Sequence, residues 1–275
     1  MGRVTMRVPT TRWDLGSGVS VTRPDTVAVE EPLEVRVNGR LVMSTMRTPG
    51  DDLELAVGWL LAEGALRSVE DIAHGMHCTD LGPDGSPTFN VLELRLRPGV
   101  ELALPAERPP HTMTSACGVC GTSTIDAILE RGGPDLSGDE TRCSPEVLVT
   151  LPEKLRQAQT VFEKTGGLHA AGLFSVDGEL LVAREDVGRH NAADKVLGWA
   201  ARHRPGPLTG LVLQLSGRVS FELVQKAWMA GVPVVSAVSA PSSLAVQVAQ
   251  RAGMTLAGFV RDPRLTVYSR PDRLT

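Results

Sequence analysis

Three short apolar runs in the second half of the chain alternate with helical segments, and this alternation constrains the fold more than any other feature. The runs Leu211–Leu215, Val232–Val238 and Met254–Val260 are typical of strands buried on both faces. Helical periodicity fills the two intervals, over Val219–Ala230 and Ser242–Ala252. Strands that alternate with helices need right-handed crossovers, so the pattern predicts a mostly parallel sheet with helices on both faces.

Three further elements precede this region. A helix is predicted over Pro145–Lys164, a hairpin over Leu173–Val176 and Glu179–Ala183, and a second helix over Arg189–Arg202. The order helix, hairpin, helix, strand, helix, strand, helix, strand resembles the cytidine-deaminase-like fold, a three-layer α/β/α domain. Zinc deaminases need His-x-Glu and Pro-Cys-x-x-Cys at two helix starts, and neither motif stands there, so deaminase chemistry is not predicted.

The sequence pattern in the first half of the chain predicts a smaller folded unit. Alternating apolar residues over Thr26–Thr48 flank Asn38-Gly39, a strong hairpin-turn signal, and a helix is expected to start within Thr48–Asp52. We therefore divide the chain into a flexible N-terminal lead-in (1–25), a small α+β domain (26–104), a connector with a Cys-x-x-Cys loop and a short helix (105–144), and the α/β/α domain (145–275).

Composition excludes two classes of partner. The 275 residues have a formal net charge of −4, so no generally basic surface for nucleic acid is predicted. No run of 18 apolar residues and no secretory signal can be read, so we expect no membrane association and a cytoplasmic location. The four cysteines are irregularly spaced, which agrees with free thiols in a reducing compartment.

Two of these thiols, Cys117 and Cys120, stand two residues apart with a glycine after each. Thr122 and the apolar-periodic residues after it predict a short helix over Thr122–Arg131. A helix N-terminus favours thiolate over thiol and lowers a cysteine pKa from about 8.5 into the range ~3.5 to 7.5. The pair is therefore a candidate nucleophile.

From the residues alone, four interpretations of this pair stay open: a structural zinc site, a thioredoxin-like redox pair, a persulfide carrier, and two buried cysteines. Zinc needs two more ligands at comparable spacing, and Cys78 and Cys143 stand far away. We interpret His74 and His77 as ordinary strand residues, and predict no metal site.

Three segments place polar residues where a strand ends and a helix starts. They are Arg184–Asn191, Ser216-Gly217-Arg218 and Ser239–Ser243. In open α/β sheets ligands bind at the carboxyl edge, and helix N-termini bind phosphate. Each segment alone is explained by helix capping, but the three together predict a nucleotide-like ligand.

Four motifs match a known family. They are Cys117-Gly118-Val119-Cys120-Gly121, Thr165-Gly166-Gly167-Leu168-His169-Ala170-Ala171, Glu185-Asp186-Val187-Gly188-Arg189-His190-Asn191-Ala192-Ala193-Asp194-Lys195 and Ser216-Gly217-Arg218-Val219-Ser220. With them the chain, from about Val27 to Tyr268, resembles the formate dehydrogenase accessory sulfurtransferases, the FdhD/NarQ family.

The resemblance implies a sulfurtransferase that takes persulfide sulfur from a cysteine desulfurase and sulfurates the bis(molybdopterin guanine dinucleotide) molybdenum cofactor for its client, formate dehydrogenase. Cys117 would carry the sulfur, with Cys120 as the second catalytic cysteine. GDP would be a partial mimic of the cofactor. We expect cofactor contacts from Phe259, Val260, Arg261, Asp262, Pro263, Arg264, Arg189, His190, Asn191, Asp194, Lys195, Ser216, Gly217, Arg218, Ser239 and Ser242.

Two other functions remain open: a cofactor-binding chaperone without sulfur transfer, and a thiol-disulfide redox protein. The sequence also leaves open whether the protein forms a homodimer.

Overall fold

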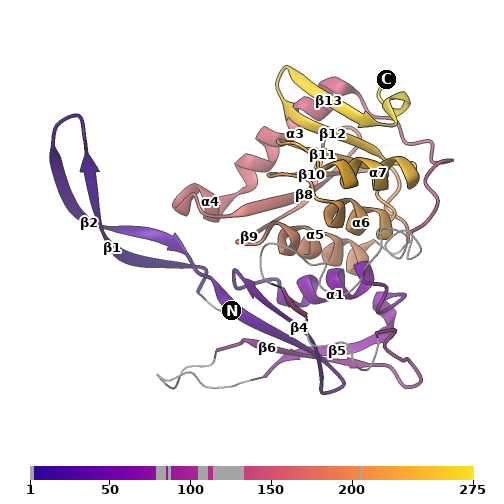
Figure 1. The fold of residues 1–275 in the computed structure, drawn as a ribbon. Coiled ribbons are helices and arrows are strands. Elements are labelled where there is room, and N and C mark those ends of the chain that lie inside the picture. The colour runs from indigo at the N-terminus through magenta and orange to yellow at the C-terminus, as the bar shows by residue number, and fades with distance from the viewer. Residues whose placement is uncertain (1–2, 79–84, 86–87, 105–110, 114–132, 205) are drawn as a thin grey trace.

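A computed structural model describes residues 3–78, 85, 88–104, 111–113, 133–204 and 206–275, and arranges them in three sheets with helices (Figure 1). Helices α1 (Asp52–Ala62) and α5 (Arg189–His203) pack against each other between the two larger sheets. The chain is therefore a mixed α/β protein, as its alternating pattern predicts.

The larger sheet has six strands in the order β13-β12-β11-β10-β8-β9. One core joins one face of this sheet to α5, α6 (Phe221–Met229) and α7 (Ser243–Arg251), and a second core joins the opposite face to α3 (Pro145–Ala158). These elements therefore form three layers, while kinship to cytidine-deaminase-like folds stays a prediction. The strands are β8 (His169–Ser175), β9 (Leu180–Asp186), β10 (Leu211–Leu215), β11 (Val234–Ala237), β12 (Thr255–Arg261) and β13 (Arg264–Ser269).

The prediction of a mostly parallel sheet is wrong. Strands β10, β11 and β12 are parallel neighbours, but β8 pairs antiparallel with both β9 and β10, and β13 pairs antiparallel with β12. The turns between β8 and β9 and between β12 and β13 are too short for a crossover, so each can join only antiparallel strands. The last strand, β13, was not predicted.

The helix predicted over Pro145–Lys164 is broken at Gln159. Helix α3 ends at Ala158, and α4 (Thr160–Thr165) starts after Gln159, whose φ of −84° and ψ of 77° are not helical. The Glu185 carboxylate accepts hydrogen bonds from the backbone N–H groups of Val161 (2.9 Å) and Phe162 (2.7 Å). A side chain far away in the sequence thus caps the new helix, which local periodicity cannot reveal.

The smaller sheet has the order β5-β6-β3-β4-β7, and apolar residues of α1, such as Leu55 and Trp59, pack in its core. The predicted hairpin turn is confirmed, because Asn38 and Gly39 have φ of 50° and 81°. The strands are β3 (Glu31–Val37), β4 (Arg40–Arg47), β5 (Ile72–His77), β6 (Val91–Leu96) and β7 (His111–Met113); a 3-10 turn, η1 (Val69–Asp71), precedes β5.

Parts of the predicted connector belong to the folded units. Strand β7 pairs in parallel with β4, so His111–Met113 completes the smaller sheet. After residue 132 the chain packs on the second half: the Trp228 indole donates to the Pro134 carbonyl (2.7 Å). The fully buried Arg273, in the C-terminal 3-10 turn η2 (Pro271–Arg273), donates to the Leu136 carbonyl (2.6 Å).

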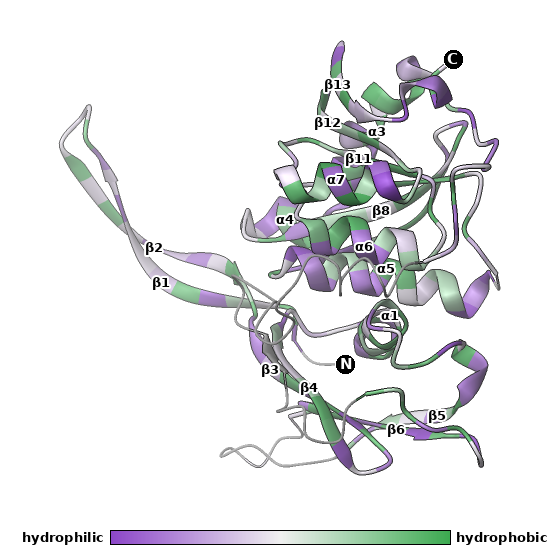
Figure 2. Cartoon of the chain, turned by 45° about the vertical axis from the view of Figure 1, so that its right-hand side comes forward, coloured by the Kyte–Doolittle hydropathy of each residue, from purple (hydrophilic) through white to green (hydrophobic). Residues whose placement is uncertain are grey.

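Residues 1–25 were predicted to be a flexible lead-in, and the structure gives most of the described ones regular strand conformation. Strands β1 (Thr5–Asp14) and β2 (Val19–Ala28) form a two-stranded ribbon that projects from the body (Figure 1, Figure 2). Pro9 and Pro24 stand opposite each other in the register of this ribbon. In a two-stranded ribbon both strands are edges, so a missing N–H can face solvent without loss.

Among the described residues no helix is long and apolar enough to cross a membrane.

Candidate functional site at the carboxyl edge of the larger sheet

The carboxyl ends of four strands lie at one edge of the larger sheet. Strands β10, β11 and β12 are parallel, and β9 runs the same way because β8 is antiparallel to both β9 and β10. The three polar segments predicted to bind a ligand follow β9, β10 and β11, and the turn at Asp262-Pro263 follows β12. The predicted juxtaposition is therefore confirmed, while ligand contact stays a prediction.

Backbone hydrogen bonds fix these segments relative to one another. The Val219 N–H donates to the Ala240 carbonyl (3.1 Å), and the Ser242 N–H donates to the Val219 carbonyl (2.9 Å). The Phe259 N–H donates to the Ser239 carbonyl (3.3 Å). The edge is thus a connected backbone framework on which the side chains are displayed.

Positive charge gathers at this edge. Arg218 is exposed, and Arg189 is the first residue of α5. The Nε atom of Arg189 is buried and has no hydrogen-bond partner in the part of the chain that the structure describes. A buried guanidinium nitrogen without a partner is costly unless an acceptor binds it, so this atom fits an anionic ligand.

His169, at the start of β8, lies at the same edge, where an added β-carbon on Gly217 would come within 3.3 Å of its Nδ1. Burial lowers the pKa of His169, and the positive charges of Arg189 and Arg218 lower it further. The imidazole is therefore neutral at pH 7 and can either donate or accept a hydrogen bond.

His190 was predicted to contact the cofactor, and the structure places it against α6. Its Nε2 lies 2.9 Å from the Ser220 hydroxyl and 2.9 Å from the Glu222 carboxylate. This ring nitrogen joins the start of α5 to the start of α6.

The segment Phe259–Arg264 forms the end of β12 and the turn to β13. Phe259 is 46% exposed with a φ of 51°, and Arg261, Asp262, Pro263 and Arg264 are exposed. Val260 is the exception: its side chain is fully buried in the sheet, so its predicted contact with a ligand does not fit its position.

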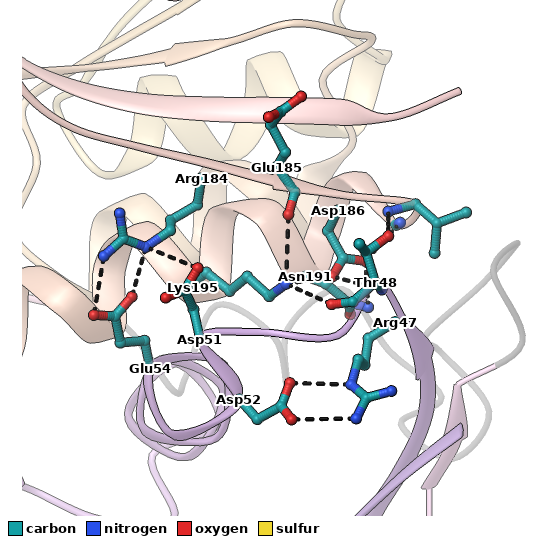
Figure 3. Close-up of polar contacts among 12 residues, drawn as sticks. Arg47, Thr48, Asp51, Asp52, Glu54, Arg184, Glu185, Asp186, Asn191 and Lys195 are labelled. Atoms are coloured by element: carbon teal, nitrogen blue, oxygen red, sulfur yellow. Dashed lines mark hydrogen bonds and ion pairs between the residues drawn. The ribbon is translucent and has the colours of Figure 1, made fainter. Parts of the chain in front are cut away.

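Asn191, Asp194 and Lys195 were also predicted to bind the cofactor, but all three are buried and bound to protein groups. Lys195 donates to the Thr48 carbonyl (2.9 Å) and pairs with the Asp186 carboxylate (2.8 Å) (Figure 3). Asn191 donates to the Met46 carbonyl (2.8 Å). The Asp194 carboxylate accepts from the Lys226 ammonium at 2.7 and 2.9 Å. Asn191 and Lys195 therefore join the two halves of the protein, whereas Asp194 ties α5 to α6 within the second half.

Asp186 is the centre of this junction. Its carboxylate, fully buried, accepts from the N–H groups of Thr48 (3.2 Å) and Gly188 (2.8 Å) as well as from Asn191 and Lys195. The carboxylate thus fixes the start of α5 and ties it to the chain between β4 and α1.

Two further ion pairs near the junction were missed from the sequence, one across it at Arg184 and one within the first half at Arg47. Arg184 lies 2.7 Å from Glu54, and Arg47 lies 3.0 Å from Asp52 (Figure 3). The only hint in the sequence was acidic residues in the first turn of α1, which helix capping explains equally well.

Cys117, Cys120 and the helix predicted over Thr122–Arg131 lie outside the described residues. Of the other cysteines, Cys143 is buried and Cys78 is half-buried. No group of three His, Cys, Asp or Glu residues in the described part of the chain is placed to hold a metal ion.

Comparison with known proteins identifies the family. The sequence profile of the FdhD/NarQ family matches residues 28–275. The chain belongs to the FdhD/NarQ family. Two FdhD/NarQ relatives, both named sulfur carrier protein FdhD, are 49% identical over 276 residues (Streptomyces coelicolor) and 51% identical over 259 residues (Mycobacterium tuberculosis). These matches cover 100% and 93% of this chain and 97% and 94% of the relatives.

The fold of this FdhD/NarQ protein also matches a crystal structure. A protein from Desulfotalea psychrophila, described as a formate dehydrogenase accessory protein, is similar with a TM-score of 0.76. The match covers 99% of this chain and all of the other, at 24% identity, so it bears on the fold alone.

Proposed function

We propose that the protein is a sulfur carrier that receives sulfane sulfur on Cys117 from the persulfide of a cysteine desulfurase and delivers it to the bis(molybdopterin guanine dinucleotide) molybdenum cofactor of formate dehydrogenase. Family membership supports the sulfur-carrier part, because relatives with about half their residues identical are named sulfur carrier protein. One structural observation supports cofactor binding: the polar edge where Arg189 keeps a buried Nε without a partner among the described residues.

The proposed loading step is a thiol exchange. The Cys117 thiolate attacks the outer sulfur of the donor persulfide, a new S–S bond forms on Cys117, and the donor leaves as its thiolate. Attack by Cys120 on the inner sulfur then forms a Cys117–Cys120 disulfide and releases hydrosulfide. Hydrosulfide, together with one proton from solvent, would replace an oxo ligand of the substrate cofactor, and this ligand leaves as water. Two equivalents of an external thiol then reduce the Cys117–Cys120 disulfide and are themselves oxidised to a disulfide.

We propose that the cofactor's diphosphates lie along the carboxyl edge. Arg189, Arg218 and Arg261 would supply charge-assisted hydrogen bonds, and Ser216, Gly217, Ser239 and Ser242 would supply hydroxyl and backbone donors. The entrance to this diphosphate site would be lined by five other predicted residues: His190, Phe259, Asp262, Pro263 and Arg264. Asn191, Asp194 and Lys195 would hold these elements in place rather than contact the cargo.

Loading of Cys117 is tested by incubating the protein with a cysteine desulfurase and cysteine, followed by peptide mass mapping. We expect one added sulfur on Cys117, retained in Cys120→Ala and lost in Cys117→Ala. If Cys120→Ala loses the sulfur and Cys117→Ala keeps it, the two roles are exchanged. If both variants load like the parent, the carrier function is wrong.

Cofactor binding is tested by calorimetry with GDP. A charge-assisted hydrogen bond contributes about 1.5 to 3 kcal/mol, so Arg218→Ala or Arg189→Ala should weaken GDP binding about tenfold or more. Arg251→Ala, at an exposed position near the other end of α7, is the control and should bind GDP like the parent. Equal binding by all three variants would place the cofactor elsewhere.

The alternative functions separate in the same experiments. A chaperone without sulfur transfer would bind GDP but take no sulfur on Cys117. A thiol-disulfide redox protein would cycle between dithiol and disulfide without retaining added sulfur in Cys120→Ala.

A further inference from the structure

The ribbon formed by β1 and β2 stands clear of the rest of the molecule (Figure 1, Figure 2). Its strands pair in register from Thr5 opposite Ala28 to Asp14 opposite Val19. At about 3.3 Å per residue, two paired strands of this length extend about 33 Å. A two-stranded ribbon without a third strand or a helix on it is only marginally stable in water, so this ribbon gains stability when another molecule covers it.

The turn at the end of the ribbon is held in one conformation. The Asp14 carboxylate accepts from the N–H groups of Gly16 (2.9 Å) and Ser17 (3.2 Å), and the Gly18 N–H donates to the Asp14 carbonyl (2.8 Å). Leu15, in the middle of this turn, is 90% exposed. A binding element whose turn is already ordered loses less conformational entropy when a partner binds.

Large apolar side chains are exposed on the outer half of the ribbon. Trp13, which is 67% exposed, precedes the turn with Leu15, and Val19 and Val21 follow it and are also exposed. Exposed apolar side chains that gather in this way mark an interaction site, and buried Trp and aliphatic anchors supply much of the affinity of protein interfaces. The outer half of the ribbon therefore fits a partner with an apolar groove.

The ribbon also carries positive charge that no described group offsets. Arg7, Arg12 and Arg23 form no ion pair with any described carboxylate. The two acidic residues of the strands, Asp14 and Asp25, each accept hydrogen bonds from backbone N–H groups of neighbouring residues instead. Complementary charge on a partner for these arginines is negative, so the partner's groove has an acidic rim.

The base of the ribbon lies beside the candidate site. Strand β2 contacts α4, and the Glu185 carboxylate at the end of β9 holds the first N–H groups of α4. Glu185 belongs to the first of the polar segments at the carboxyl edge of the larger sheet. A protein bound to the ribbon is thus held next to this edge, where the client must collect the cofactor.

We propose that the ribbon is a docking arm for the client, formate dehydrogenase, and that it binds an apolar groove with an acidic rim on that enzyme. This inference rests on the function proposed above, because the client receives the cofactor at the carboxyl edge. A lipid surface is disfavoured as the partner, since the turn at the end of the ribbon carries the Asp14 carboxylate, which is costly to remove from water.

The test is biolayer interferometry between the full chain and purified formate dehydrogenase prepared without its molybdenum cofactor. The double variant Trp13→Ser/Leu15→Ser should weaken binding about tenfold or more, as expected when two apolar anchors are truncated. Arg12→Glu/Arg23→Glu is a second variant that keeps the apolar residues and should slow association. Met76→Ser, at an exposed apolar position on β5, is the matched control and should bind like the parent.

Loading of Cys117 by the cysteine desulfurase should be unchanged in both ribbon variants. If the variants bind the client like the parent, the docking arm is wrong while the sulfur-carrier function stands. Loss of Cys117 loading with normal client binding would make the donor the occupant of the ribbon, and loss of self-association alone, measured by sedimentation, would make it a second copy of this chain. Either result overturns the proposal. If the parent does not bind the client, the docking arm and the client part of the proposed function are both overturned.

Discussion

Gly58 of α1 and Gly198 of α5 meet where these two helices cross, and each leaves room for the backbone of the opposite helix. A β-carbon added to Gly198 would lie 1.9 Å from the Glu54 carbonyl oxygen, and one added to Gly58 would lie 2.0 Å from the Asp194 carbonyl oxygen. The junction between the two halves thus depends on two glycines inside helices, where glycine by itself costs about 1 kcal/mol relative to alanine.

Gly198→Ala should therefore destabilise the protein although alanine favours helices. The added methyl group must push α1 away from α5, and overpacking of this kind lowers the free energy of unfolding by about 1 to 3 kcal/mol. Urea denaturation measures the change. Gly138→Ala is the control, because an added β-carbon there has no atom within 4 Å. Equal midpoints for both variants would contradict the close helix contact.

Lys195→Met should destabilise the protein by weakening the junction between its two halves. Lys195 is 1% exposed and pairs with the fully buried Asp186, so its removal leaves an unpaired buried carboxylate. Breaking a buried ion pair in this way costs about 3 to 5 kcal/mol. Thermal denaturation should show a large drop in Tm for Lys195→Met and little change for Lys164→Met, at an exposed position on α4. A small effect at position 195 would mean that water readily solvates Asp186.

Much of the larger sheet could be predicted because its signals are local. The apolar run Leu211–Leu215 forms β10 with the predicted bounds, and the helix predicted over Arg189–Arg202 is α5 with one more residue. Strands that share a direction bring their carboxyl ends together, so the site edge followed from the same pattern.

Long-range partners could not be predicted. Helix α3 ends before Gln159 because Glu185, which lies on strand β9, caps the next helix, α4. Nothing near Gln159 in the sequence reveals this contact. Asn191 and Lys195 lie in a motif that was interpreted as ligand binding, but their partners, at Met46 and Thr48, lie about 145 residues earlier. Gly58 and Gly198 were the available hint, since glycine inside a helix often marks close packing.

The purified protein should contain less than one zinc ion per chain. The Cys117–Cys120 pair supplies two ligands, and a structural zinc site needs four. Elemental analysis after dialysis without chelator is the measurement. One tightly bound zinc per chain, lost in Cys117→Ser, would instead make the pair a metal site and contradict its role in sulfur transfer.

Asp194 should make stability depend on pH. Burial raises the pKa of Asp194 to about 6, although Lys226 partly offsets this effect. The ordinary value is 3.8, so between about pH 4 and pH 6 the folded protein keeps a proton that the unfolded chain has released. The stabilisation from this group is complete below about pH 4 and is lost as the pH rises to 6.

The measurement is the free energy of unfolding of the parent and of Asp194→Asn, which cannot titrate, at several pH values. The value for the parent minus that for the variant should fall from pH 4 to pH 6 and stay constant above. A difference that rises over this interval would show that attraction to Lys226 outweighs burial.

The thiols should differ sharply in reactivity. Cys143 is 3% exposed, its Sγ donates to the Val176 carbonyl (3.6 Å), and burial together with the negative charge of Asp177 raises the pKa of the thiol to about 11. Because thiolate is the reactive form, Cys143 should stay unlabelled by iodoacetamide at pH 7.5 and also at pH 9, both below its pKa. Cys117 should be labelled at pH 7.5, and urea should expose Cys143 to the reagent. Peptide mass mapping shows which cysteines are labelled and how fast. If Cys143 in the folded protein were labelled at the same rate as Cys117, this would contradict both the burial of Cys143 and the activation of Cys117.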